Sequence, residues 1–198
     1  MPRRSAAEAA ATHQMIVERA VAVASTDGLE GVTIGRLATD LSMSKAGVIG
    51  HFGTKEALQL AALEDAAARF ARDVWGPAEA KPPGIERLQA ICRAWSTYLV
   101  GPAFPGGCFM TAASFEFDDR PGPVHDRLAE LLRLWRGVIR REAAAAAAAG
   151  DLPHDTDPGQ IAFELAALAA GTAQAHQLYR DPRAAARCRK AMARVLGG

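Results

Sequence analysis

Apolar residues recur every three to four positions along most of the chain, which is the spacing of helices packed on one face. The first predicted helix has Thr12 as a candidate N-cap and ends at Gly28. Its apolar face is made of Ile16, Ala20, Val23 and Ala24. No sustained run of alternating β-branched residues predicts a strand. The pattern therefore predicts an all-α protein of about nine helices.

Three more helices are predicted before residue 76. Thr33 can cap a short helix in "VTIGRLATDL", and Ser44 can cap the next one, which runs to Phe52 and is closed by Gly53. Thr54 can cap a longer helix over "TKEALQLAALEDAAARFARDVW". Residues 33–52 have the spacing of a helix-turn-helix, whose second helix can enter the major groove of DNA.

Pro- and Gly-rich breaks divide the rest of the chain, beginning with "GPAEAKPPG" at 76–84. Helices are predicted over 85–100, 108–117, 124–149, 160–179 and 183–196. We expect two domains: a three-helix DNA-binding domain at 1–56, and a helical bundle at 57–198 for ligand binding and dimerisation.

The pattern of charges, cysteines, histidines and apolar residues argues against a disulfide-stabilised protein, a zinc protein and a membrane protein. The net charge is +1, so DNA binding has to rest on where the basic residues lie rather than on their number. The three cysteines form no C-x-x-C, and the histidines have no metal-ligand spacing. The apolar tract at 161–175 contains Glu164 and Gln174 and is too short to cross a bilayer. We expect a cytoplasmic protein with no metal, no cofactor, no membrane contact and no catalytic residues.

The third helix, 45–52, has an outer face of small residues. Val48 and Phe52 lie four residues apart and are predicted to pack inward. This leaves on the outside and at the leading end Lys45, Ala46, Gly47, Ile49 and Gly50. Small residues at these positions would let the helix backbone come close to DNA, whereas an internal glycine otherwise weakens a helix by about 1 kcal/mol relative to alanine.

Residues 12–58 resemble the DNA-binding region of the TetR (tetracycline-repressor) family of bacterial transcription regulators. The resemblance is carried by G-x-x-x-x-T-x-x-x-L-A, S-K-A-G-V, the HF pair and T-K-E-A-L, at the family's spacing. It covers about a quarter of the chain, and the remainder is similar to the family only in being helical.

The resemblance implies roles for individual residues. It places Thr33, His51 and Lys55 at phosphates, and Lys45, Ala46 and Gly47 at base edges. The expected DNA-binding set is Arg3, Arg4, Thr33, Ile34, Gly35, Lys45, Ala46, Gly47, Ile49, Gly50, His51 and Lys55. Ile49 departs from the family, which usually has an aromatic residue there, often Tyr. We therefore expect sparse direct base readout, supplemented by apolar contacts and DNA shape.

The family resemblance also implies a small-molecule effector bound among the middle helices. The candidate lining residues are aromatic: Trp95, Tyr98, Phe109, Phe115, Phe117 and Trp135. Few charges lie on these segments, so a neutral, apolar ligand is expected. Breaks on both sides of 108–117 would allow this short helix to shift as a unit. The alternative interpretation is that the aromatics are ordinary core.

Small residues in "AFELAALAAGTAQA" would let two helices approach closely and form a homodimer interface. The expected interface is Ala162, Leu165, Ala166, Ala169 and Ala173. The leading interpretation is a dimeric DNA-binding transcription regulator, a repressor released from a double-stranded operator by an apolar effector. The alternatives are a helical ligand-binding or scaffolding protein with a degenerate helix-turn-helix, and a small helical enzyme.

Overall fold

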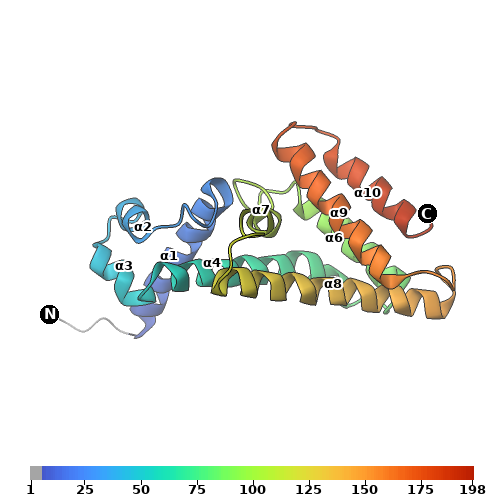
Figure 1. The fold of residues 1–198 in the computed structure, drawn as a ribbon, viewed down its shortest axis with the longest axis horizontal. Coiled ribbons are helices and arrows are strands. Elements are labelled where there is room, and N and C mark those ends of the chain that lie inside the picture. Colours follow the sequence, from blue (N-terminus) through green and yellow to red (C-terminus); the bar gives the residue numbers. More distant parts are fainter. Residues whose placement is uncertain (1–5) are drawn as a thin grey trace. The chain divides into compact units, whose positions relative to one another are not determined.

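The computed structural model describes residues 6–198, and every regular element among them is a helix (Figure 1). The α-helices before the first long loop are α1 (Ala6–Asp27), α2 (Ile34–Asp40), α3 (Lys45–Phe52), α4 (Lys55–Phe70) and α5 (Gly76–Glu79), with a π-helical turn, η1 (Ala71–Trp75), between the last two. They are followed by α6 (Ile85–Tyr98), α7 (Phe109–Glu116), α8 (Pro123–Ala149), α9 (Pro158–Gln177) and α10 (Ala184–Val195). Because α4, η1 and α5 follow one another directly, the described chain has nine separate helical segments, and the all-α prediction is confirmed.

The predicted start of the first helix is wrong. Thr12 lies inside α1, which begins at Ala6, and its hydroxyl donates a hydrogen bond to the Glu8 carbonyl one turn earlier. Alanines at 6, 7 and 9–11 explain the longer helix, since alanine has the strongest helix propensity. The predicted break at 76–84 is also shorter, because α5 continues the helix to Glu79. Arg3 and Arg4 lie outside the described residues.

The helices form two compact units. The first contains the described residues up to Ala67 together with Phe104–Leu128, and the second contains Ala68–Ala103 and Ala129–Gly198. The compact units divide the chain by packing, first between Ala67 and Ala68. The predicted functional boundary between residues 56 and 57 stays a prediction. Among residues 6–198, no helix has the length and apolarity that a bilayer crossing requires.

In the first unit, α7 and the loop before it are bonded to the end of α1. The Glu116 carboxylate accepts hydrogen bonds from the backbone N–H groups of Leu29 and Glu30, both at 2.8 Å. In the loop that precedes α7, the Gly106 N–H donates a hydrogen bond to the Ser25 hydroxyl at 3.3 Å. A Cβ at Gly106 would lie 1.6 Å from the Ser25 carbonyl oxygen, so only glycine fits this approach.

In the second unit, α9 and α10 pack together and both contact α6 (Figure 1). Four aromatic rings form a cluster in which Phe70 is edge-on to Trp95, Tyr98 and Trp135, with ring centroids 4.9–6.0 Å apart. One carboxylate, Glu142, is only 1% exposed. It accepts hydrogen bonds from the Gly84 N–H at 3.1 Å and from Arg87 at 3.4 Å, which compensate its burial.

Candidate nucleic-acid interface

Side-chain caps define both helices of the helix-turn-helix. The Thr33 hydroxyl accepts a hydrogen bond from the Arg36 N–H at 3.2 Å, and the Ser44 hydroxyl accepts one from the Gly47 N–H at 3.0 Å. Gly53 ends α3 with a φ of 73°, a conformation that favours glycine. These local predictions from the sequence are confirmed. As a phosphate contact, Thr33 stays a prediction, and its hydroxyl is exposed beside the first turn of α2.

The inner side of α3 is held in the first unit as predicted. Val48 is fully buried, and the ring of Phe52 stacks on His13 of α1 with centroids 4.5 Å apart. His51 is also near His13, with centroids 6.1 Å apart and the rings nearly edge-to-face. This packing fixes the rotation of α3, and therefore decides which of its residues face outward.

The outer side of α3 is exposed and nearly free of large polar side chains. Lys45, Ala46, Ile49 and Gly50 are exposed, with Ile49 at 46%, and Gly47 is half-buried. A Cβ added at Gly50 would meet nothing within 4 Å, and the φ of this residue is not positive. The fold therefore gives no steric or backbone reason for glycine at this position.

Lys45 projects from the first turn of α3 over the start of α2. Its Cε and Nζ atoms come within 3.5 and 3.8 Å of where a Gly35 Cβ would lie, so Gly35 leaves room for the lysine chain. Ile34, the other predicted contact on α2, is half-buried. Lys45 is the one lysine or arginine within residues 6–62 that has no carboxylate partner. This leaves its ammonium group available to an outside acceptor.

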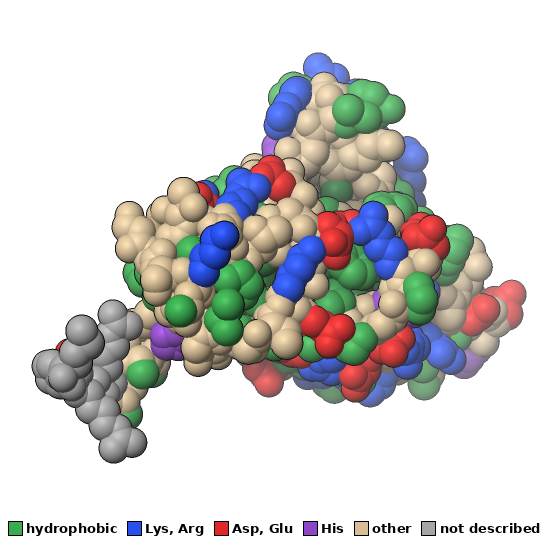
Figure 2. Space-filling model, turned by 60° about the vertical axis from the view of Figure 1, so that its left-hand side comes forward, with side chains coloured by type: hydrophobic (Ala, Val, Ile, Leu, Met, Phe, Trp, Pro, Cys, Tyr) green, Lys and Arg blue, Asp and Glu red, His purple; other side chains and the backbone are tan. Residues whose placement is uncertain are grey.

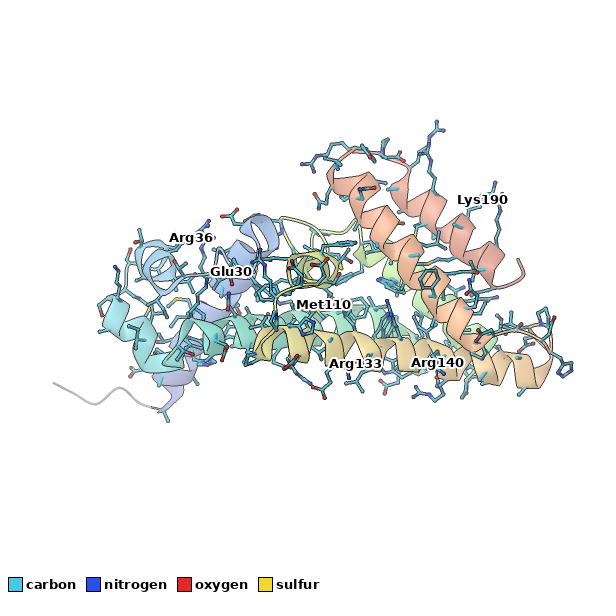
Figure 3. All side chains as sticks on the ribbon, in the orientation of Figure 1. Glu30, Arg36, Met110, Arg133, Arg140 and Lys190 are labelled. Carbon is cyan, nitrogen blue, oxygen red and sulfur yellow. The ribbon has the colours of Figure 1, made fainter. Side chains whose placement is uncertain are left out.

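The other basic side chains of this region are engaged. Lys55 binds Glu30 at 2.8 Å, and this hydrogen bond, followed by one from Gln59, lowers the pKa of the Glu30 carboxyl. Arg36 binds Asp27 and lowers its pKa, and it lies 3.8 Å from Asp40, which also pairs with Arg19 at 2.7 Å. Glu30 and Arg36 are labelled in Figure 3. Lys55 can bind a phosphate only by sharing or leaving Glu30.

This set of ion pairs is not apparent from the sequence. The partners are separated along the chain, 21 residues for Arg19 and Asp40 and 25 for Lys55 and Glu30, so no short pattern predicts them. Figure 2 shows the result on one face: lysine and arginine side chains are interspersed with acidic and uncharged ones. The charge balance of this region leaves Lys45 as its distinctive cation.

The residues predicted to bind an effector are divided between the two units. Trp95, Tyr98 and Trp135 belong to the aromatic cluster of the second unit, where Trp95 and Trp135 are also in direct edge-to-face contact. In the first unit, Phe109 and Phe117 are buried, whereas Phe115 is 67% exposed. Phe109 lies 5.9 Å from Phe104, and Arg120 lies over the Phe117 ring. Their role in ligand binding stays a prediction.

The predicted dimer residues lie mostly inside the second unit. Four of the five are buried by the chain's own packing, and only Ala166 is half-exposed: Ala162, Leu165, Ala169 and Ala173 are the buried ones. The small side chains of α9 thus serve its packing on α6 and α10. The opposite face of α9 is exposed and is described below.

Comparison with known proteins identifies both regions. Residues 16–62 match the model of bacterial regulatory proteins of the tetR family. Residues 84–192, more than half of the chain, match the tetracyclin repressor-like C-terminal domain. No curated protein sequence matches the chain.

Solved structures have the same fold. A TetR transcriptional regulator from Chloroflexus aurantiacus is 22% identical, with a TM-score of 0.84 over 96% of this chain and 94% of that one. A TetR-family regulator from Cytophaga hutchinsonii is 21% identical, with a TM-score of 0.83 over 100% and 98%. A cysteine mutant of the TetR-family regulator CifR, complexed with 26-base-pair double-strand operator DNA, is 22% identical, with a TM-score of 0.77 over 100% and 98%. The matches to both domain models show that this chain belongs to the TetR family of DNA-binding transcriptional regulators.

Proposed function

We propose that the protein is a repressor that binds its operator through α3. The observation that carries this proposal is the combination of Lys45, without a carboxylate partner, and an outer α3 face of exposed small residues. A lysine in the first turn of a recognition helix can donate to guanine O6 and N7, and Ala46 or Ile49 can contact thymine methyl groups. Repression is favoured by the match to a repressor-like C-terminal domain.

We place the remaining contacts on DNA phosphates. Thr33 and His51 lie at the start of α2 and the end of α3, and Lys55 opens α4, where the helix dipole favours an anion. Phosphate binding by Lys55 exchanges one anionic partner, Glu30, for another. CifR, which shares the fold, is complexed with operator DNA, and this supports DNA as the partner.

We propose that the repressor is a homodimer that pairs through the outer stripe of α9. This stripe consists of Phe163, Ala167, Gly171, Gln174 and Leu178, which are all exposed and recur at helical spacing. Phe163 and Leu178 are 61% and 66% exposed, which is high for large apolar side chains. Ala167 and Gly171 between them would allow two α9 helices to approach closely. A two-fold dimer would then present two α3 helices to half-sites about 34–36 Å apart.

We further propose that a small, mainly apolar effector releases the repressor. Release requires the effector to bind the DNA-free conformation more tightly, by about 1–3 kcal/mol for a modest switch. The second unit offers an apolar surface for such a ligand around Tyr98, one of the predicted lining residues, whose ring packs edge-to-face against Phe70.

The proposal is tested by footprinting the purified protein on DNA upstream of its own gene, followed by anisotropy titrations at several salt concentrations. We expect protection of a palindromic site, with affinity for it at least about 10³-fold above that for random DNA. Equal affinity for both DNAs would contradict the proposal and favour a ligand-binding protein with a degenerate helix-turn-helix. Transcription from the protected promoter, with and without the protein, distinguishes repression from activation.

A further inference from the structure

A surface groove with a volume of about 720 Å³ lies in the second unit, along α6. This volume is within the range of about 300–1,000 Å³ that small-molecule sites occupy. Its apolar wall comes from α5, α6 and the segment after α6: Pro77, Ala90, Ala94, Tyr98, Pro102 and Ala103. The groove is shallow and largely open to solvent, so a bound ligand would keep part of its surface in contact with water.

Two of the charged side chains that line the groove are cations without partners. Arg93 and Lys81 are exposed, and neither is in an ion pair with any residue of the described chain. The third charged residue, Asp73, is paired with Arg72 at 3.0 Å, so its charge is already compensated. The groove therefore combines an apolar wall with uncompensated positive charge.

The end of the groove near Lys81 is fixed by the protein itself. Arg87 donates two hydrogen bonds to the Lys81 carbonyl, at 2.6 and 3.0 Å, and lies over the Trp75 ring at 5.5 Å. Arg87 is held in turn by the buried Glu142 carboxylate at 3.4 Å. These bonds order the main chain at Lys81 before a ligand arrives, which lowers the conformational cost of binding there, whereas the Lys81 side chain itself is exposed.

The π-helical turn forms part of the same groove. Pro77 has no N–H, and its ring would clash with the carbonyl of Asp73 in a regular α-helix. The chain adopts the wider turn just before this point, where the Gly76 N–H bonds to the Ala71 carbonyl. Asp73 and Pro77 both line the groove. Such turns occur often at functional sites, and a ligand here would touch the segment that continues α4.

We infer that this groove is the effector site and that its ligand is an amphipathic organic anion. The apolar part lies against Ala90, Ala94 and Pro102, and the anionic group binds Arg93 and Lys81. This inference rests on the proposed effector-released repressor and specifies its ligand. The sequence predicted a neutral effector because the segments with the aromatic candidates carry few charges, whereas the groove combines Arg93 of one such segment with Lys81 from the break before it.

The test compares three eight-carbon probes by calorimetry on the full-length protein: octanoate, 1-octanol and octylammonium. Octanoate should bind most tightly and octylammonium least. Arg93→Gln should weaken octanoate binding at least about tenfold, as expected for one lost charge-assisted hydrogen bond, with little effect on 1-octanol. Ala94→Phe, which fills the groove, should weaken both. The matched control is Arg189→Gln, an exposed arginine on α10 that does not line the groove.

The inference is overturned if octanoate does not bind, if 1-octanol binds as tightly, or if Arg93→Gln and Ala94→Phe both leave octanoate affinity unchanged. A second measurement follows operator affinity as octanoate is added. We expect it to fall for the wild type and to stay constant for Arg93→Gln, and an unchanged wild-type affinity would overturn the effector role. Failure of the proposed repressor is recognised separately, as absence of selective operator binding with no probe present.

Discussion

Gly50 is a glycine that the protein's own structure does not require. Nothing lies within 4 Å of the position of its missing Cβ, and its φ is not positive. Gly50→Ala should therefore stabilise α3 by about 0.5–1 kcal/mol. If close approach to DNA is the reason for this glycine, the same substitution should weaken operator binding. Thermal unfolding and anisotropy on one protein preparation would measure both effects.

The matched control is Gly137→Ala in α8, another helical glycine with open space around its missing Cβ. It should raise stability by a similar amount and leave operator affinity unchanged. Unchanged or improved operator binding by Gly50→Ala would show that DNA does not approach α3 at this residue.

Lys45 and Lys55 are predicted to differ in the kind of contact they make. Lys45→Ala should remove about 1–3 kcal/mol of operator binding and lower the preference for operator over random DNA, because it takes away a base contact. Lys55→Ala should weaken both DNAs alike and reduce the salt dependence by about one unit, as a lost phosphate contact does. Anisotropy titrations over a salt series measure both. An unchanged operator preference in Lys45→Ala would refute base reading.

The three cysteines are predicted to be unreactive in the folded protein. Burial raises the pKa of Cys92 to about 12, and it also raises the pKa values of Cys108 and Cys188. A raised pKa keeps each thiol protonated at pH 7–9, and only the thiolate attacks alkylating reagents. Iodoacetamide labelling at pH 8 should therefore be slow until denaturant is added. Rapid labelling of one thiol in the native protein would identify a reactive cysteine instead.

At the scale of elements, Glu116 connects α7 to the turn between α1 and α2. Glu116→Ala removes the acceptor of two backbone N–H groups, and should destabilise the first unit by about 1.5–3 kcal/mol. Hydrogen exchange of the Leu29 and Glu30 amides should accelerate by the factor that this loss of stability predicts. A general loss of helicity would instead accelerate exchange at many other residues. Asp119→Asn, an exposed change in the loop after α7, is the control. Unaltered exchange at both amides would contradict this role.

Local sequence signals predicted most of the helix ends. Contacts between residues far apart in the sequence were not predicted. Thr33, Ser44 and Gly53 act within four residues of themselves, so the sequence is sufficient to assign them. Glu116 bonds residues 86 and 87 positions away, and nothing in "EFDDRPGP" indicates those partners. The π turn lies at the end of the predicted long helix, just before Pro77, and helical spacing alone does not distinguish such a turn from a regular α-helix.

The same distinction applies to the candidate sites. The face of α3 follows from helical spacing, because Val48 and Phe52 pack on one side and Lys45 and Ile49 remain on the other. The spacing of α9 indicated small residues but not which face the chain would cover. The packing of α9 on α6 and α10 determines which face is covered: Ala169 is buried and Ala167 is exposed.

At the scale of the whole molecule, the proposed dimer predicts different outcomes for two neighbouring substitutions. Ala167→Arg, in the outer stripe of α9, should give a folded monomer that no longer binds a full operator. Ala169→Arg places a charge where alanine is 2% exposed, and should lower the unfolding temperature itself. Sedimentation velocity and thermal unfolding separate the two effects. A monomeric wild type at micromolar concentration would argue against the dimer.

The hydrogen bonds of Glu116 also connect α7 to the start of α2 through a short stretch of main chain. Glu116 holds Leu29 and Glu30, and Thr33, which caps α2, follows Glu30 by three residues. A displacement of α7 must either carry these two amides along or break both hydrogen bonds, and the Ser25–Gly106 bond restrains the opposite flank. A displacement of α7 would therefore reach the start of α2 through the Glu116 carboxylate and one short turn of main chain, without passing along α1.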